Sequence, residues 1–309
     1  MKGPLFYAKI LLFGEYGIIK DSKGLAIPYN SYQGALKKSD KTSEIEIKSN
    51  KNLKKFYDYL LNMDNQNLVS FRLDEFKTDI EEGMYFDSSI PQGYGVGSSG
   101  ALVASVYDKY ANDKITVLEN LTREKLLKLK SIFSLMESFF HGKSSGLDPL
   151  NSYLSIPILI NSKDNLEPTG IPSQKEGKGA VFLLDSEMTG ETEPMVSIFM
   201  NKMKNEGFRK MLNEDFAKYT DACIDDFLHG NVKSLFGNVK QLSKVVFDNF
   251  KPMIPQTFHN VWQKGIESND YYLKLCGSGG GGYILGFTED FAKTQTILKD
   301  YKLELVYRF

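Results

Sequence analysis

The chain has 309 residues, 41% of them hydrophobic and 25% charged, so it can bury enough apolar surface to fold without help. Its 38 basic and 39 acidic residues leave a net charge of -1, which excludes a nucleic-acid or membrane partner bound by bulk charge. Two cysteines and three histidines exclude a disulfide framework and show no zinc-ligand spacing. The length favours two domains.

The first predicted element is a buried strand over residues 5–13 (LFYAKILLF). Lys9 interrupts its apolar run, and the ammonium must leave the core or find an anionic partner; Glu15, just after Gly14, is one candidate for an ion pair. A signal peptide is not favoured, because of Lys9 and because no small-residue cleavage site follows. No segment approaches the roughly 20 apolar residues of a membrane span. We therefore expect a reducing, cytoplasmic setting without a membrane partner.

Strand and helix patterns then alternate up to residue 90. Strands are predicted over 24–38, 43–49 (SEIEIKS) and 84–90, and helices around 53–61 and 71–80. The last of these strands leads into PQGYGVGSSGALVASVYDKY, over residues 91–110, in which four glycines and two serines run directly into an alanine-rich amphipathic segment. A helix is predicted from about Gly100 to Ala111.

This first glycine loop has the features of a phosphate-binding segment. Its glycines let backbone amides approach a ligand closely, and the start of the following helix favours an anion. Ser98 and Ser99 place hydroxyls at the same terminus, suited to a phosphate oxygen or a metal ion. The bland alternative is a flexible turn whose serine caps the helix.

Two better-known glycine motifs fit this loop poorly. Residues 95–100 (GVGSSG) match the dinucleotide fingerprint, but Pro91 and Gln92 separate loop from strand and no parallel βαβ repeat is visible. No Lys-Ser/Thr follows the glycines, which excludes a Walker A loop.

A helix predicted over 122–140 ends at His141-Gly142 and carries Glu137 in its last turn. A negative charge there is unfavourable against the helix dipole and asks for a partner such as a metal ion; a solvated glutamate is the alternative. Asp148 precedes Pro149, so it is compatible with a simple helix N-cap.

The second half begins after a polar, turn-rich stretch over 161–179, the best boundary candidate. Strands are predicted around 153–160, over 181–185, at YYLKLCG, YILGF and LELVYRF, and helices over 206–229, 231–248, 255–267 and 290–300. A second glycine run, CGSGGGG, lies between two of these strands, YYLKLCG and YILGF. Its five glycines each cost on the order of 0.5–1 kcal/mol against alanine, which indicates a place where backbone passes close to something; a floppy hairpin is the alternative.

Together, KILLFGEY, PQGYGVGSSGAL, HGKSSGLD and LCGSGGGGY resemble, in order and across almost the whole chain, the motifs of the GHMP kinases. This superfamily is named after galactokinase, homoserine kinase, mevalonate kinase and phosphomevalonate kinase, and HGKSSGLD is similar to the mevalonate kinase form. The resemblance implies an α+β fold with two domains: a ribosomal-protein-like N-terminal domain over 1–177 and a ferredoxin-like C-terminal domain over 178–309.

The resemblance also implies site residues. Asp148 matches the catalytic base and Lys9 the lysine that pairs with it; Ser99 and Glu137 match the Mg²⁺ ligands. Residues that match substrate positions are Glu15, His141 and, through the segment TGET, Thr192. Residues expected to bind the ATP phosphates are Gly93, Gly95, Val96, Gly97, Ser98, Ser99, Gly100, Gly279 and Gly280.

The implied activity is transfer of the ATP γ-phosphate to the primary hydroxyl of mevalonate, with ATP, Mg²⁺ and a small hydroxylated acid as partners. Phe6-Tyr7-Ala8 replaces the usual Ala-Pro-Gly, Tyr16 replaces the histidine of Gly-Glu-His, and Gly100 replaces an alanine. The first two changes put the acceptor in more doubt than the chemistry. A homodimer is compatible with the sequence, which does not reveal the oligomeric state.

Several alternatives stay open. Phosphomevalonate kinase, diphosphomevalonate decarboxylase and a sugar kinase belong to the same superfamily. A nucleotide-binding protein without transfer activity would keep both glycine loops but would not need Asp148 and Lys9 together. A Rossmann oxidoreductase is a weaker third class.

Overall fold

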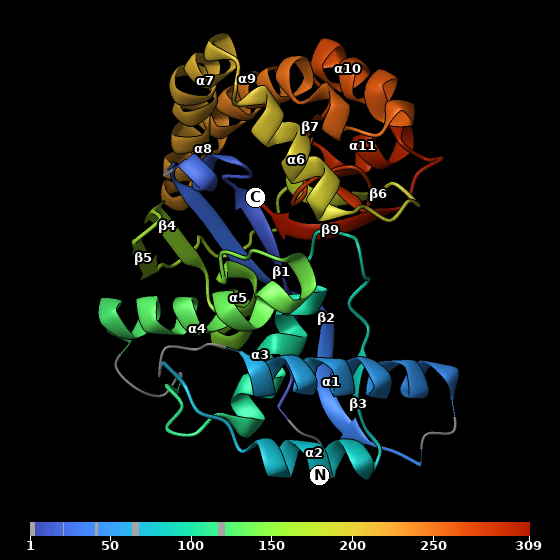
Figure 1. Ribbon diagram of the computed structural model, residues 1–309. Coiled ribbons are helices and arrows are strands. Elements are labelled where there is room, and N and C mark those ends of the chain that lie inside the picture. Colours follow the sequence, from blue (N-terminus) through green and yellow to red (C-terminus); the bar gives the residue numbers. More distant parts are fainter. Residues whose placement is uncertain (1–3, 21, 41–42, 64–67, 117–120) are drawn as a thin grey trace. The chain divides into compact units, whose positions relative to one another are not determined.

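The computed structural model describes residues 4–20, 22–40, 43–63, 68–116 and 121–309, which fall into two compact units (Figure 1). Unit 1 takes its residues from Met1–Lys9, Pro28–Pro91 and Gly97–Ile156, and unit 2 from Ile10–Ile27, Gln92–Val96 and Pro157–Phe309. This grouping differs from the expected division between residues 177 and 178. The reason is that the first two strands and the first glycine loop each run from one unit into the other.

The first two strands are confirmed as β1 (Phe6–Phe13) and β2 (Gly24–Lys38). Strand β1 is buried along nearly its whole length, as its unbroken apolar run predicts. They belong to a five-stranded sheet of order β1-β2-β4-β5, in which β3 also pairs with β2. The other strands of this sheet are β3 (Met84–Ser88), β4 (Ile158–Ser162) and β5 (Asn165–Pro168). Strand β2 pairs antiparallel with β3 and with β4, and β4 pairs antiparallel with β5.

The described residues of unit 1 also form the helices α1 (Glu44–Asn62), α2 (Leu73–Glu81), α3 (Ser98–Tyr110), α4 (Arg123–His141) and α5 (Leu147–Leu154). Helices α3, α4 and α5 pack on one another, and α1 packs on α2 and β3 (Figure 1). Their core is rich in aromatic rings; Phe76 and Tyr110, for example, lie with ring centroids 4.4 Å apart.

The strand predicted over 43–49 is wrong, because these residues form the start of α1. Ser43 accepts a hydrogen bond from the Glu46 amide, and the Glu46 side chain accepts one from the Ser43 amide, so a capping box begins the helix. The alternating isoleucines do not mark a buried strand face, since Ile45 is 79% exposed.

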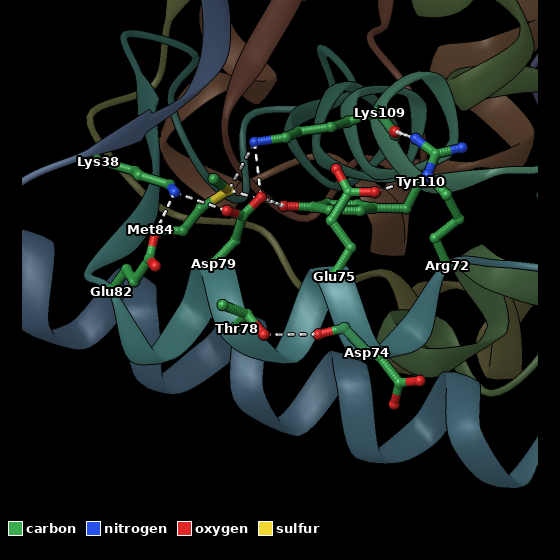
Figure 2. Close-up of polar contacts among 10 residues, drawn as sticks. All are labelled: Lys38, Arg72, Asp74, Glu75, Thr78, Asp79, Glu82, Met84, Lys109 and Tyr110. Atoms are coloured by element: carbon green, nitrogen blue, oxygen red, sulfur yellow. Dashed lines mark hydrogen bonds and ion pairs between the residues drawn. The ribbon is translucent and has the colours of Figure 1, made fainter.

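One buried carboxylate ties several elements of unit 1 together. Asp79 on α2 accepts ion pairs from Lys38 of β2 at 2.7 Å and Lys109 of α3 at 2.8 Å, and a hydrogen bond from the Tyr110 hydroxyl at 2.7 Å (Figure 2). Burial favours the neutral form of Asp79, but the three donors outweigh it and lower the Asp79 pKa to about 2. We call Asp79 with these three partners the Asp79 cluster.

Unit 2 contains a four-stranded antiparallel sheet of order β7-β8-β6-β9. Its strands are β6 (Ala180–Asp185), β7 (Tyr272–Leu275), β8 (Tyr283–Thr288) and β9 (Leu303–Arg308), close to the predicted ranges. Helices of unit 2 are α6 (Thr192–Lys202), α7 (Glu206–Met211), α8 (Ala217–His229), α9 (Val232–Asn249), α10 (His259–Ser268) and α11 (Phe291–Ile297). Helices α9 and α10 pack against β7, and α9 also contacts β8 (Figure 1).

Two details of unit 2 differ from the predictions. Helix α6 was not predicted; its sequence carries a proline in the first turn and only one fully buried residue, Phe199. The helix predicted over 206–229 consists of α7 and α8 joined by a π-helical segment, Leu212–Phe216. Among the described residues, no helix is both long enough and apolar enough to cross a membrane.

Candidate active site

Lys9 and Asp148 form an ion pair inside unit 1. Lys9 lies on β1 and is only 4% exposed, and its Nζ is 2.8 Å from Oδ1 of Asp148. A buried ammonium needs such a partner, which accounts for a lysine within an apolar strand. Asp148 lies in the first turn of α5, whose N-cap is Gly146, so the N-cap interpretation of Asp148 is wrong. The sequence offered Glu15 as a candidate partner of Lys9. In the structure Lys9 pairs with Asp148, and Glu15 pairs with Lys274 in unit 2.

The second half of the first glycine loop packs directly on this pair. Helix α3 begins at Ser98, two residues earlier than predicted, with Gly97 as its N-cap in the left-handed region at φ 81°. A Cβ on Gly97 would lie 3.0 Å from the Lys9 side chain, and one on Gly100 would lie 2.8 Å from the Asp148 backbone. The unpaired amides of a helix start therefore lie next to an acid and an amine.

Glu137 is buried next to the start of α3. It is 3% exposed, so the interpretation as a solvated glutamate is wrong. Ser99 Oγ donates a hydrogen bond to Glu137 Oε1 at 3.2 Å, and Ser144 Oγ donates to Oε2. Burial raises the Glu137 pKa, and the charge of Asp148 raises it further; the two serines and Lys9 offset only part of this, and the pKa is about 8.

These oxygens fit a small divalent cation. A hydroxyl and a carboxylate lie side by side, which are ligands that Mg²⁺ prefers, and burial together with the charge of Asp148 raises the pKa of this carboxylate. Within the described part of the chain, no group of three or more His, Cys, Asp or Glu side chains forms a metal site. A cation at Ser99 and Glu137 would therefore complete its shell with water or phosphate oxygens, as Mg²⁺ commonly does.

His141, at the end of α4, also lies beside Ser99. Its Nε2 is 3.1 Å from Ser99 Oγ. Burial lowers the His141 pKa, and the charge of Asp148 opposes this. The predicted contact of His141 with a substrate stays a prediction.

The remaining predicted phosphate-binding residues lie in unit 2. Here the first half of the first glycine loop packs on the second glycine run: a Cβ on Gly95 would lie 2.5 Å from the Cys276 carbonyl oxygen. Val96 is buried, and Gly190 N donates to Gly93 O at 2.8 Å. The second run is ordered by contacts rather than floppy.

Within that second run, Gly279 and Gly280 have φ of 75° and 79°, a region that favours glycine. The Gly280 amide donates to Met253 O at 2.7 Å, so this amide is already used within unit 2. The expected phosphate contact of the two glycines stays a prediction.

Two predicted substrate residues also lie in unit 2. Glu15 is 5% exposed and its carboxylate binds the buried ammonium of Lys274, which itself is 2% exposed. Thr192 begins α6 and is exposed, and Ser278 Oγ donates to Thr192 Oγ1 at 3.5 Å.

The sequence predictions missed Lys274 and Ser144. Lys274 interrupts the apolar strand YYLKLC in the way that Lys9 interrupts LFYAKILLF, so the same signal pointed to it. Ser144 lies between Glu137 and Asp148 in chain order, but nothing in the sequence singles out which of the two serines at 144 and 145 reaches the glutamate.

One family model matches part of the chain. Residues 54–155 match the family model described as the GHMP kinases N terminal domain. A search of the curated proteins found no match.

Solved structures share the fold over nearly the whole chain. An L. major mevalonate kinase in complex with R-mevalonate is 16% identical, with 97% of this chain and 93% of that chain covered and a TM-score of 0.63. The Methanococcus jannaschii mevalonate kinase is 17% identical, with 99% and 98% covered and a TM-score of 0.59. A Streptococcus pneumoniae phosphomevalonate kinase in complex with phosphomevalonate and AMPPNP is 12% identical, with 98% and 99% covered and a TM-score of 0.62.

The α+β fold expected from the resemblance is thereby confirmed. Residues 54–155 thus match the N-terminal domain of the GHMP kinases, and the likeness of the whole chain to the mevalonate kinase structures is a likeness of fold.

Proposed function

We propose that this protein is an ATP-dependent kinase that phosphorylates the primary hydroxyl of mevalonate. One observation carries the proposal: the carboxylate of Asp148 and the ammonium of Lys9 lie 2.8 Å apart, packed against the first turn of α3 through Gly97 and Gly100. Phosphate binding to the amides of that turn brings a phosphoryl donor to an acid and an amine.

In this mechanism Asp148 orients the acceptor hydroxyl and accepts its proton. Phosphoryl transfer passes through a loose transition state, so positioning and charge stabilisation supply most of the acceleration. Lys9 holds the carboxylate in place and offsets negative charge that accumulates as the phosphoryl group approaches. The partners of both groups belong to unit 1, where β1, α3 and α5 fix them.

Ser99 and Glu137 would hold Mg²⁺, which when bound neutralises charge on phosphate oxygens. Without it, Glu137 keeps a proton near neutral pH because burial and Asp148 raise its pKa. The Ser144 hydroxyl donates to one oxygen of the Glu137 carboxylate and so holds the other oxygen towards Ser99.

The choice of mevalonate rests on the form of the segment HGKSSGLD and on the fold shared with mevalonate kinases. Phosphomevalonate kinase has equal standing by fold, since one such structure reaches a TM-score of 0.62. The acceptor is therefore what an experiment must settle.

The test is a coupled ADP-release assay with ATP and magnesium over mevalonate, phosphomevalonate, homoserine and galactose. We expect ADP release that depends on mevalonate and a phosphorylated product identified by mass spectrometry. Turnover with another acceptor alone would keep the kinase and replace the acceptor. ATP hydrolysis that ignores every acceptor would contradict the transfer reaction.

A further inference from the structure

Helix α5 is tied to β1 by a hydrogen bond one helical turn beyond Asp148. Ser152 lies on α5 and is 1% exposed, and its hydroxyl donates to the Tyr7 carbonyl of β1 at 2.6 Å. Both residues belong to unit 1, as do Lys9 and Asp148. Ser152 and Tyr7 are 145 residues apart in the chain, so the bond joins two elements and is not part of a local turn.

This bond and the Lys9–Asp148 ion pair are successive links between the same two elements. Tyr7 and Lys9 are two residues apart on β1, which corresponds to about 6.6 Å along a strand. Asp148 and Ser152 are four residues apart on α5, which corresponds to about 6 Å along a helix and places both on one face. Because the two spacings match, each link fits where the other leaves the helix.

The two links differ in stiffness. Lys9 reaches Asp148 through a flexible four-carbon chain, so the ion pair alone tolerates a shift of the helix. The Ser152 hydroxyl is attached directly to Cβ and binds backbone, so it fixes the distance between α5 and β1. The serine is therefore the link that restrains the helix.

The Asp148 carboxylate depends on such a restraint. Its side chain is 37% exposed, whereas that of Lys9 is 5% exposed, so packing encloses the amine more than the acid. The start of α5 also packs closely on α3, since a Cβ on Gly100 would lie 2.8 Å from the Asp148 backbone. Ser152 supplies a second fixed point one turn further along the helix.

We propose that Ser152 is a positioning residue that fixes α5 on β1 and thereby sets the place of the Asp148 carboxylate relative to the Lys9 ammonium. Its effect on turnover rests on the proposed function, in which Asp148 accepts the proton of the acceptor hydroxyl. Ser152 is too buried to touch a substrate, so it acts through Asp148. Small displacements of a catalytic group are costly, because a misplacement of about 1 Å can lower a rate 10²-fold.

The experiment compares Ser152→Ala with Ser105→Ala. Ser105 is also a buried serine of unit 1, 2% exposed, and its hydroxyl donates to the Leu102 carbonyl at 2.7 Å, but that bond stays within α3. Loss of one such bond corresponds to about a 3- to 10-fold change in an equilibrium constant, so the urea midpoints of both variants should fall by similar amounts. Only Ser152→Ala should also lower kcat, by about that factor, with the KM for ATP within about twofold. Equal kcat in the two variants would overturn the inference.

A second comparison tests whether Ser152 acts through Asp148. Residues that act as a unit have non-additive effects, so adding Ser152→Ala to Asp148→Asn should change the remaining turnover by less than about twofold. If Ser152→Ala lowers turnover by the same factor with and without Asp148, the serine acts independently of the acid and the inference is wrong.

A third readout does not depend on turnover. A double-mutant cycle of Lys9→Met and Asp148→Asn, measured by urea denaturation, gives the coupling of the two side chains as a factor in the unfolding constant. This factor should be about 3-fold smaller, or more, in the Ser152→Ala protein than in the Ser105→Ala protein. The same factor in both would overturn the inference. If Ser152→Ala does not fold, Ser152→Cys, which keeps only a weak donor, takes its place in each comparison.

Failure of this inference and failure of the proposed function are distinguishable. If the wild-type protein transfers no phosphate to any acceptor, the proposed function fails, and the coupling of Lys9 and Asp148 still decides whether Ser152 positions the pair. If the wild type is active but Ser152→Ala behaves as Ser105→Ala does, only this inference is refuted.

Discussion

Unit 1 contains two buried carboxylates with opposite electrostatic surroundings. Asp79 has two ammonium groups and a phenol around it, which bring its pKa down to about 2 (Figure 2). Glu137 has two serine hydroxyls and another carboxylate nearby, and its pKa rises to about 8. Two ammonium groups pair directly with the first carboxylate, whereas two hydroxyls bind the second and the nearby charge of Lys9 offsets its raised pKa only in part.

The difference indicates a structural role for Asp79 and, under the proposed function, a role in the active site for Glu137. A fully paired buried charge stabilises the element contacts around it, while a carboxylate raised by burial and a like charge is typical of a functional site. Burial alone would not separate them, because both residues are less than a tenth exposed. Their partners do.

The largest expected effect is a loss of activity when the candidate active site is changed. Asp148→Asn keeps the shape but cannot accept a proton, so kcat should fall by about 10²–10⁴-fold with the KM for ATP nearly unchanged. Steady-state ADP release measures it. Asp108→Asn is the matched control. Asp108 also forms an ion pair in unit 1, with Lys114 at 2.7 Å, but it lies near the C-terminal end of α3, away from the helix start. Near-normal turnover in Asp148→Asn would remove it from its role.

The next largest effect is a loss of stability when the Asp79 cluster is changed. Asp79→Asn removes the charge that both Lys38 and Lys109 bind, and we expect a loss of about 2 kcal/mol in the free energy of unfolding. Urea denaturation measures it, and the kcat per folded molecule should not change. The exposed pair Lys37–Asp87 gives the control, since Asp87→Asn should cost less than about 0.5 kcal/mol. Equal losses in both variants would contradict the Asp79 cluster as a stabilising centre.

The pH dependence of stability sharpens the comparison. The Asp79 pKa is about 2 when folded and about 3.9 when unfolded, so its contribution is present above about pH 4 and is lost as the pH falls toward 2. Because its lysine partners are partly exposed, we discount the loss to about 1–2 kcal/mol. Urea midpoints between pH 2 and 5 should fall less steeply in Asp79→Asn than in the wild type.

The smallest expected effect has the opposite sign. The Glu137 pKa is raised in the folded state, so ionising this side chain above about pH 4 costs stability. Glu137→Gln removes that cost and should stabilise the metal-free protein at pH 8 by about 1 kcal/mol, while raising the magnesium concentration needed for activity. Thermal denaturation with a chelator and a magnesium titration measure the two changes. A destabilised variant with an unchanged magnesium requirement would refute the assignment.

Much of the fold and of the unit 1 site could be predicted from the sequence because the signals are local. A lysine inside an apolar strand needs a counter-charge, and glycines before a helix permit close packing, which leads to Lys9, Gly97 and Gly100. The segment 43–49 misled because its isoleucines alternate with glutamate as in a strand, although both isoleucines are exposed on α1. Its Ser43 and Glu46 carried the correct signal, a capping box.

What could not be predicted depends on contacts between distant segments. Asp79 sits in an ordinary amphipathic pattern, and only the fold brings Lys38 and Lys109 to it. In the same way, Tyr7 and Ser152 are 145 residues apart along the chain, and no local rule joins them. Each unit is built from separate stretches of sequence, partly because the 15 residues of β2 are divided between the two units.

The bare faces of Gly97 and Gly100 have a mechanical consequence. With no side-chain atoms between this backbone and the groups behind it, any shift of the loop must displace Lys9 and Asp148 as well. Under the proposed function, a phosphoryl donor that moved the loop on binding would therefore move the acid and the amine with it. A methyl group at either glycine would push the two layers apart and loosen this mechanical link.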